Sequence, residues 1–158
     1  MSQPESPDAD RHWLTEAIAL SQRCAPSTSA FSVGAILAAP DGSLLTYGFS
    51  RERGPSDHAE EVALARAAEA GLDSSVLASA TMYSSLEPCA ARGSRPVPCA
   101  DLIIANGVGR VVIAWREPPI FVPGGGAVRL RQAGVKVIVI PELAAAAKAV
   151  NAHLLPSA

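Results

Sequence analysis

The stretch TMYSSLEPCAARGSRPVPCADLIIANGVGRVVIAW, residues 81–115, decides the fold of this chain. It predicts a strand over 81–85, a loop rich in Gly and Pro, a short helix over 99–106 and a strand over 110–115. Two Pro-Cys pairs occur in it, one after the first strand and one where the helix begins. Alternation of strand and helix is typical of an α/β fold.

Further strands and helices flank this stretch on both sides. The additional elements that the periodicity predicts are a helix over 10–23, strands over 31–38 and 43–50, a helix over 58–71, a helix over 127–133, a strand over 135–140 and a helix that begins at 141. Pro40-Asp41-Gly42 is a turn tripeptide that joins the first two strands into a hairpin. A helix between the last two strands is what a parallel pair requires. We therefore expect a mixed five-stranded sheet with helices on both faces.

Length and composition favour a single small domain. A chain of 158 residues with 49% hydrophobic positions can bury one core and is too short for two ordinary domains. Residues 1–10 are polar, acidic and proline-containing, so we expect a disordered tail there and one domain over 11–158. The first residues lack the basic and apolar regions of a secretory signal, which favours a cytoplasmic protein.

Charge and hydropathy restrict the expected partners. The net charge is −2 and no block of Lys or Arg occurs, so the chain lacks the electrostatic footprint of a nucleic-acid-binding protein. No uninterrupted apolar stretch approaches the roughly 18 residues that span a bilayer. We therefore expect a small-molecule substrate, no nucleic acid and no membrane.

Four residues have the types and the order needed for a zinc-dependent hydrolase. His58, Cys89 and Cys99 can supply three zinc ligands, which leaves one position of a tetrahedral site for water, whereas a structural zinc normally has four protein ligands. Glu60 would carry protons without binding the metal. His-x-Glu followed by Pro-Cys and a second Cys is the signature of deaminases that act on nucleobases. The pattern predicts one zinc ion per chain and a catalytic Glu60.

The same residues also have a structural interpretation. Asp57 could be the N-cap of the following helix, with Glu60 as its capping-box partner three residues later. On a regular helix His58 and Glu60 do not share a face, so their spacing alone does not bring them together. Glu61, about 100 degrees further round the helix, is the weaker candidate for the proton carrier. The helix cap and the catalytic carboxylate both stay open at this point.

A longer set of residues carries a resemblance to a known family. It comprises Ser85-Leu86-Glu87-Pro88-Cys89, then Gly93, Pro96, Pro98 and Cys99, then Ala100-Asp101-Leu102-Ile103 and Arg129-Leu130-Arg131-Gln132-Ala133-Gly134-Val135. In these positions, and over most of its length from about Phe31, the chain resembles the deaminase domain of the bifunctional riboflavin-biosynthesis deaminase/reductase, within the cytidine deaminase-like superfamily.

The resemblance implies more than the pattern does. It implies a three-layer α/β/α sandwich, a zinc ion on the His/Cys/Cys set and Glu60 as the proton shuttle. It also implies that the backbone at Ser84, Ser85 and Leu86 contacts the amino group of the substrate. With the apolar helical stretches of so small a chain, it further predicts a homo-oligomer, a dimer or a tetramer.

The chain departs from that family around the expected pocket. Nine residues separate its cysteines, and this loop has Ala91, Arg92 and Arg95 where the family usually has His and Thr. The two guanidiniums would suit a phosphate on the substrate, and ordinary surface charge is the alternative. Ser-Ala-Phe-Ser over 29–32 replaces a Pro-Asn-Pro segment, and Glu117-Pro118-Pro119 replaces Asp-Pro-Asn-Pro. Trp115 could wall the pocket or lie in the core.

Three functions follow from this reading. The leading one is hydrolytic removal of a ring amino group from an aminopyrimidine, or from its nucleotide as in riboflavin biosynthesis, with release of ammonia. A cytidine, deoxycytidylate or other nucleobase deaminase would use the same residues. The alternative from another class is a zinc-stabilised binding protein without activity, in which His12, His153 or Cys24 closes the metal site. Glu60 argues against the last, because a structural zinc needs no proton carrier.

Overall fold

The computed structural model describes residues 7–91, 96–118, 120–121 and 124–156. Arg92 and Arg95 lie outside the described residues. The strands are β1 (Gly34–Ala38), β2 (Leu44–Phe49), β3 (Thr81–Leu86), β4 (Arg110–Trp115) and β5 (Lys136–Val139). The helices are α1 (Pro7–Ser21), α2 (Ala59–Glu69), α3 (Ser74–Ser79), α4 (Cys99–Ala105), α5 (Gly126–Gln132) and α6 (Ala144–Val150), with 3₁₀ turns η1 (Pro141–Leu143) and η2 (Ala152–Leu154).

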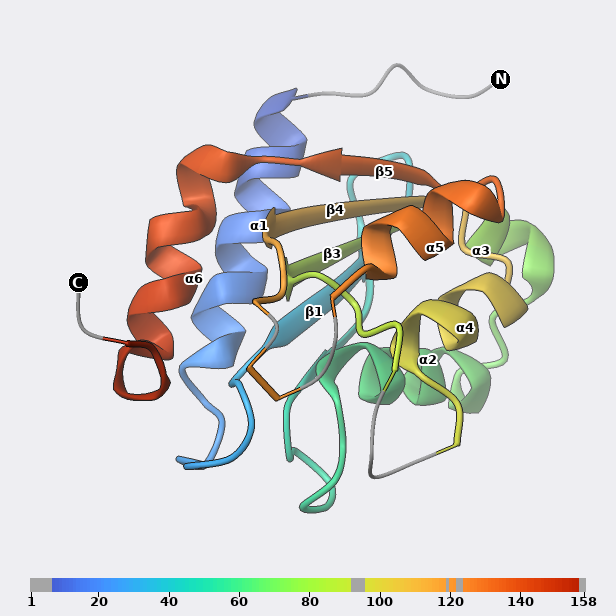
Figure 1. Ribbon diagram of the computed structural model, residues 1–158. Coiled ribbons are helices and arrows are strands. Elements are labelled where there is room, and N and C mark those ends of the chain that lie inside the picture. Colours follow the sequence, from blue (N-terminus) through green and yellow to red (C-terminus); the bar gives the residue numbers. More distant parts are fainter. Residues whose placement is uncertain (1–6, 92–95, 119, 122–123, 157–158) are drawn as a thin grey trace.

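The five strands form one mixed sheet in the order β2-β1-β3-β4-β5 (Figure 1). β1 is antiparallel to both β2 and β3, whereas β3, β4 and β5 are mutually parallel neighbours. The parallel pairs are the ones connected through helices α4 and α5, as parallel pairing requires. The predicted mixed five-stranded sheet is confirmed.

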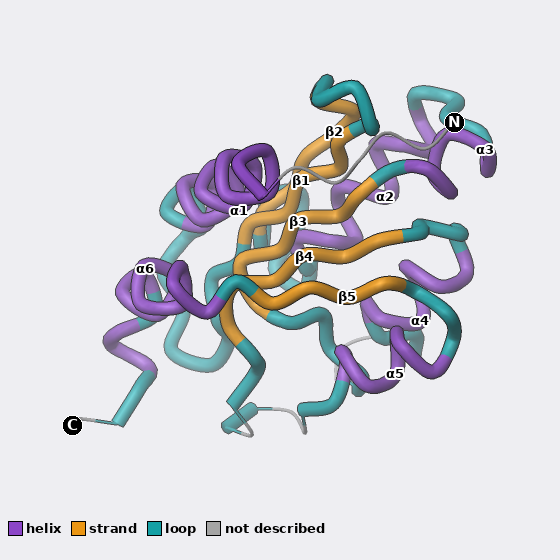
Figure 2. The backbone as a smooth tube through the Cα atoms, turned by 90° about the horizontal axis from the view of Figure 1, so that it is seen from above, coloured by secondary structure: helices purple, strands orange, loops and turns teal. Residues whose placement is uncertain are grey.

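Helices cover both faces of the sheet (Figure 2). α1 and α6 pack on one face, and α2, α4 and α5 pack on the other. The large side chains that are almost fully buried come from all three layers: Leu14, Leu37, Met82, Ile103, Ile113 and Leu130. The molecule is therefore the three-layer α/β/α sandwich that the resemblance implied. None of the helices in the described part of the chain is long and apolar enough to cross a lipid bilayer.

The first helix begins earlier than predicted. α1 starts at Pro7, so residues 7–10 are helical and do not belong to the predicted tail over 1–10. Asp10 is buried, and its carboxylate accepts hydrogen bonds from Arg110 Nη1 and Nη2 at 2.8 and 2.6 Å and from Tyr83 Oη at 2.7 Å. These contacts hold the first turns of α1 on the sheet.

Two other boundaries differ because tertiary hydrogen bonds replace local ones. The predicted strand over 31–38 shortens to β1, since Ser32 N donates to the side chain of Asn151 and Val33 N donates to Ser50 Oγ. The predicted terminal helix is divided into η1, α6 and η2. Asn151 is buried where α6 ends, and its Nδ2 donates to Ser32 O at 3.0 Å. The helix α3 was not predicted.

The ends of two strands and the beginnings of two helices lie at the same edge of the sheet. The carboxyl ends of β3 and β4 lie together, and Glu87 N donates to Trp115 O at 2.8 Å just beyond the paired strands. The first residues of α2 and α4 face the same edge (Figure 1). α2 also lies unusually close to β2: a Cβ atom added to Gly48 would stand 2.4 Å from Ala59 O. Only glycine permits this approach.

Candidate active site

Three metal-binding side chains converge at this edge. His58 Nδ1 lies 3.6 Å from Cys89 Sγ and 3.4 Å from Cys99 Sγ, and the three donor atoms all lie within 4.8 Å of one another. His58 is the N-cap of α2, Cys99 is the first residue of α4, and Cys89 lies in the loop after β3. The loop is held to the helix by Ala100 N, which donates to Cys89 O at 3.0 Å.

The geometry and the chemistry of these donors fit zinc. Zinc bonds of about 2.3 Å to sulfur and about 2.0–2.1 Å to nitrogen at tetrahedral angles require nitrogen–sulfur separations of about 3.6 Å, close to those observed. Hydrogen bonding with Cys99, and then with His58, lowers the pKa of the Cys89 thiol to about 4 against the opposing effect of burial. A thiolate is the form that binds zinc.

The other candidates for a fourth protein ligand lie elsewhere. Cys24 Sγ donates to Val33 O at 3.6 Å, and His153 Nε2 lies 2.8 Å from Ser27 O. His12 packs against a tryptophan ring. Within the described residues the metal-binding group holds His58, Cys89 and Cys99. A site with three protein ligands leaves a position for water or substrate, as in catalytic zinc sites.

Glu60 lies beside this group and is almost completely buried, with 3% of its surface exposed. It reaches the same pocket as His58 because His58 has extended backbone angles (φ −95°, ψ 153°) and therefore does not follow helical spacing. Ser84 Oγ lies 3.4 Å from Glu60 Oε1. Burial raises the pKa of the Glu60 carboxyl. A carboxyl in such a place is suited to hold and release a proton.

Of the three residues on β3 that were predicted to contact the substrate, one lines the pocket and two have side chains that bond within the protein. Leu86 lines the pocket, whereas the buried side chains of Ser84 and Ser85 serve the protein itself. Ser84 Oγ donates to Leu86 O at 2.7 Å, and Ser85 Oγ accepts from Gly34 N at 3.0 Å. The proposed phosphate-binding residues Arg92 and Arg95 are outside the described part of the chain.

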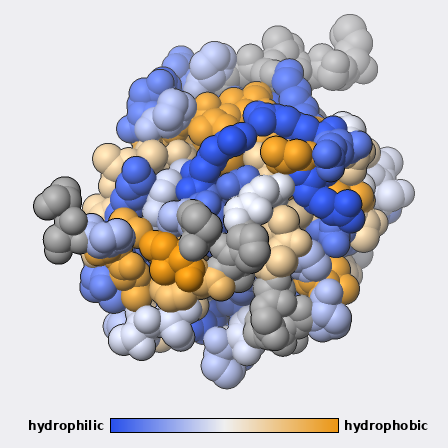
Figure 3. Space-filling model, viewed as in Figure 1, coloured by the Kyte–Doolittle hydropathy of each residue, from blue (hydrophilic) through white to orange (hydrophobic). Residues whose placement is uncertain are grey.

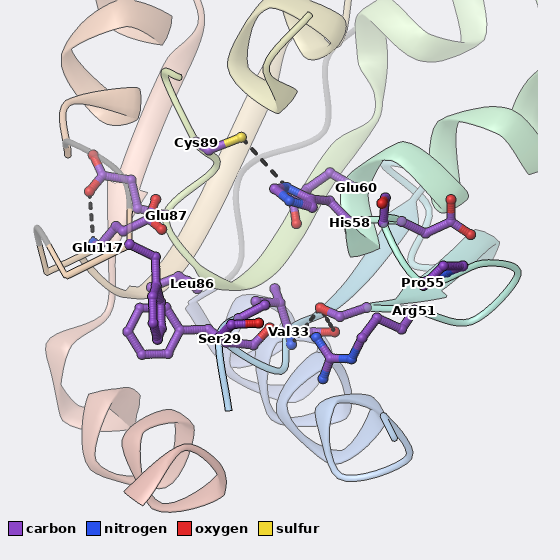
Figure 4. A pocket seen from close by; sticks show the side chains of 16 residues that line it. Ser29, Val33, Arg51, Pro55, His58, Glu60, Leu86, Glu87, Cys89 and Glu117 are labelled. Carbon is purple, nitrogen blue, oxygen red and sulfur yellow. Dashed lines mark hydrogen bonds between the residues drawn. The ribbon is translucent and has the colours of Figure 1, made fainter. Parts of the chain in front are cut away.

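A pocket of about 330 Å³ opens beside the donor group (Figure 4). Its lining comes from loops at this edge of the sheet, from the first turn of α2 and from the end of β3. It comprises Ser29, Ala30, Phe31, Val33, Ser50, Arg51, Pro55, Ser56, Asp57, His58, Glu60, Leu86, Glu87, Cys89, Glu117 and Phe121. Figure 4 shows Cys89, His58 and Glu60 close together, with Arg51 apart from them near Val33. The core interpretation of Trp115 is correct, because its ring is buried and does not line the pocket.

The sequence reasoning did not assign a role to several of these lining residues. Glu117 is one, and burial, with the negative charges of Cys89, Glu60 and Glu87, raises the pKa of its carboxyl to about 8. Arg51 and Phe121 are others. The sequence could have predicted that Glu117 lines the pocket, because it follows the predicted strand over 110–115. Ligands of α/β sheets bind outside the carboxyl ends of the strands.

Comparison with known proteins agrees with this site. The sequence model of the family described as "Cytidine and deoxycytidylate deaminase zinc-binding region" matches residues 7–115. The chain is 39% identical over 126 residues to the diaminohydroxyphosphoribosylamino-pyrimidine deaminase of Schizosaccharomyces pombe, over 80% of this chain and 31% of that protein. It is 37% identical over 129 residues to riboflavin biosynthesis protein RibD of Escherichia coli, over 81% and 33% of the two chains. The chain thus spans about a third of the length of these relatives.

Solved structures share the fold. The diaminohydroxyphosphoribosylaminopyrimidine deaminase/5-amino-6-(5-phosphoribosylamino)uracil reductase of Thermotoga maritima superposes with a TM-score of 0.76 at 30% identity, over 90% of this chain and 39% of that one. A C-terminal deletion mutant of the Rib2 deaminase of Aspergillus oryzae gives a TM-score of 0.74 at 26% identity, over 94% and 99% of the two chains. With the His/Cys/Cys group, the match to a zinc-binding region confirms zinc as the cofactor.

Proposed function

This chain belongs to the family of the cytidine and deoxycytidylate deaminase zinc-binding region, and from that premise we propose that it is a zinc-dependent hydrolytic deaminase of an aminopyrimidine. The enzyme would replace a ring amino group by a carbonyl and release ammonia. The observation that carries the proposal is the convergence of His58, Cys89 and Cys99 beside the buried carboxyl of Glu60, at one side of a pocket of about 330 Å³.

In this proposal the two cysteines and the histidine hold the metal. His58 binds through Nδ1, which is the ring nitrogen that faces both sulfur atoms. The thiolates come from Cys89 and Cys99, and the N-terminus of α4 favours the negative charge of the second. Zinc held there supplies the nucleophile by lowering the pKa of a water molecule toward neutrality.

Glu60 has the role of proton carrier. Its carboxylate would accept a proton from water as the carbon bearing the amino group is attacked, and would donate that proton to the ring nitrogen. It would then take the proton of the newly added hydroxyl and pass it to the amine, which leaves as ammonia as the carbonyl forms. The raised pKa that burial produces suits this exchange, since a buried carboxyl holds an accepted proton more firmly than an exposed one. The backbone at Leu86, together with that of Ser84 and Ser85, is proposed to position the substrate amino group.

The substrate class rests on the relatives, which are named for deamination of a phosphoribosylated diaminopyrimidine. Their similarity favours a related aminopyrimidine over cytidine or deoxycytidylate. The test is a panel of aminopyrimidine bases, nucleosides and nucleotides, including cytidine and deoxycytidylate, assayed with the zinc-loaded protein for ammonia and for the change in ring absorbance. Turnover of a diaminopyrimidine supports the proposal. Turnover of cytidine or deoxycytidylate alone supports the rival substrate, and no turnover would contradict deaminase function.

A small-molecule substrate is the only partner that this proposal requires. The cytoplasmic location and the homo-oligomer expected from the sequence stay predictions. Sedimentation at micromolar concentration tests the second, and a monomer alone would count against it.

A further inference from the structure

Three aromatic rings run from the core to the rim of the pocket. Trp115, at the end of β4, packs edge-to-face on Phe31, with ring centroids 5.1 Å apart and an interplanar angle of 67°. Phe31 packs in the same manner on Phe121, with centroids 4.9 Å apart and an angle of 66°. Trp115 and Phe31 are both 6% exposed, whereas Phe121 is 39% exposed. Phe31 and Phe121 line the pocket, so the outermost ring of the series borders the space that a substrate would occupy.

Arg51 fixes the position of the middle ring. It is the one non-glycine residue with a positive φ, 59°, among those that the structure describes. Its Nη1 donates to Phe31 O at 3.3 Å, and its Nη2 donates to Ala25 O and to Ser32 Oγ, both at 2.8 Å. The guanidinium therefore holds residues 25–32 in place through these hydrogen bonds. This leaves it poorly placed to act as the cation for a substrate phosphate, because its donors already have acceptors within the protein.

The side of the pocket near the donor group is polar and acidic. Glu60 and Glu117 line it, and both carboxylate oxygens of Glu87 accept backbone hydrogen bonds, from Glu117 N at 2.9 Å and from Ala127 N at 2.7 Å. The pocket thus combines a carboxyl-rich wall with an aromatic wall. A flat heterocycle matches both walls when its amino-bearing edge meets the carboxyls and its face meets a ring.

We propose that Phe121 is a specificity-determining residue that stacks on the planar ring of the aminopyrimidine substrate. This inference rests on the proposed function for the identity of the ring and on the aromatic series for the contact. Phe121 is exposed before a ligand binds, unlike a core residue, and Phe31 already supports its ring from behind. Little reorganisation is needed to form the stack.

The experiment compares Phe121→Ala and Phe121→Trp with Ile120→Ala. Ile120 is the matched control, since it is the neighbouring apolar residue, is 44% exposed and does not line the pocket. Stacking of a base on an aromatic side chain is worth about 1–3 kcal/mol, which converts to a loss of about 5- to 150-fold in affinity when the ring is removed. Phe121→Ala should raise KM by about that factor with little change in kcat, as expected for uniform binding. Phe121→Trp should keep the wild-type KM within about threefold, and zinc content should be unchanged in all variants.

Binding without turnover separates this inference from the proposed function. The zinc-loaded proteins are titrated with cytosine and with 2,4-diaminopyrimidine by calorimetry. If the wild type turns over no pyrimidine but binds one of these rings, and Phe121→Ala weakens that binding, deamination is wrong and stacking stands. Stacking is wrong if the wild type binds neither ring. It is also wrong if Phe121→Ala binds within twofold of the wild type, or if Ile120→Ala has the same effect.

Discussion

Glu61 accepts a hydrogen bond from the backbone N–H of His58, with 3.2 Å between His58 N and Glu61 Oε1. His58 is the N-cap of α2, so Glu61 is the third residue of the helix and closes its capping box. The sequence allowed another arrangement, in which Asp57 was the N-cap and Glu60 its partner. The structure shifts the cap by one residue. Glu60 thereby lines the pocket, where the proposed mechanism needs a carboxylate.

Replacing Glu60 by Gln should separate catalysis from folding. The amide keeps the size of the side chain but cannot carry the proton, so Glu60→Gln should retain zinc and thermal stability while losing on the order of 10² to 10⁴ in deamination rate. Steady-state kinetics with metal analysis check this. Glu61→Gln is the matched control and should keep both activity and stability, since an amide oxygen can still accept from His58 N. Near wild-type activity of Glu60→Gln would mean that the catalytic assignment is wrong.

Zinc content should depend on Cys89 and not on Cys24. Loss of residues that merely orient zinc ligands lowers metal affinity about 10- to 100-fold, and loss of a ligand should do at least as much. Cys89→Ser should therefore contain much less than one zinc per chain and melt at a lower temperature, because metal bound only to the folded state stabilises it. Elemental analysis and thermal melts measure the two effects. Cys24→Ser, which alters a thiol outside the donor group, should match the wild type; undiminished zinc in Cys89→Ser would refute the ligand set.

Acid should weaken the attachment of α1 through Asp10. Burial by itself raises the pKa of this carboxyl, but hydrogen bonds from Arg110 and Tyr83 outweigh it and lower the pKa below its usual value. A carboxyl with a depressed folded pKa stabilises the protein above its unfolded pKa, about 3.9, and that contribution is lost as the pH falls through the folded pKa. Asp10→Asn should reduce the free energy of unfolding by about 3 kcal/mol at neutral pH. It should also show a shallower loss of stability below about pH 4.

Urea unfolding across pH measures both effects, and the pair between Arg11 and Glu142 supplies a control. That pair is exposed, with 50% and 60% of the two side chains accessible. Glu142→Gln should therefore change stability by less than about 0.5 kcal/mol. An equal effect of the two substitutions would show that burial of Asp10 does not matter.

The start of α5 should tolerate no side chain at Gly126. A Cβ atom there would lie 1.7 Å from Pro88 O, the carbonyl that precedes Cys89. Gly126→Ala must push the cysteine loop away, so it should cost about 2 kcal/mol of stability and weaken zinc binding. Gly54→Ala is the control, because its added Cβ would meet nothing closer than 3.7 Å. Chemical unfolding and zinc titration compare the two, and normal zinc affinity in Gly126→Ala would contradict the coupling.

The spacing of apolar residues predicted the elements over 99–115 closely, but it missed the helix α3. The strand predicted over 110–115 is β4, and the helix predicted over 99–106 is α4 with one residue fewer. Both segments have buried faces that the spacing of apolar residues reveals. α3 was missed because it is short and has only one buried residue, Leu77. Its N-cap was readable, since Asp73 Oδ1 accepts from Ser75 N and Val76 N.

The sequence by itself determined the order of the five strands and the candidate donor set of His58, Cys89 and Cys99, because periodicity and ligand type are properties of single segments. Only the tertiary structure decided that Glu60, rather than Glu61, enters the pocket, and that Phe31 and Phe121 meet at its rim. The second outcome depends on contact between residues far apart in the chain, as does the donor group, in which 31 and 41 positions separate His58 from the two cysteines. Helical and strand periods of about 3.6 and 2 residues show which face is buried. They carry no information about which distant segment covers it.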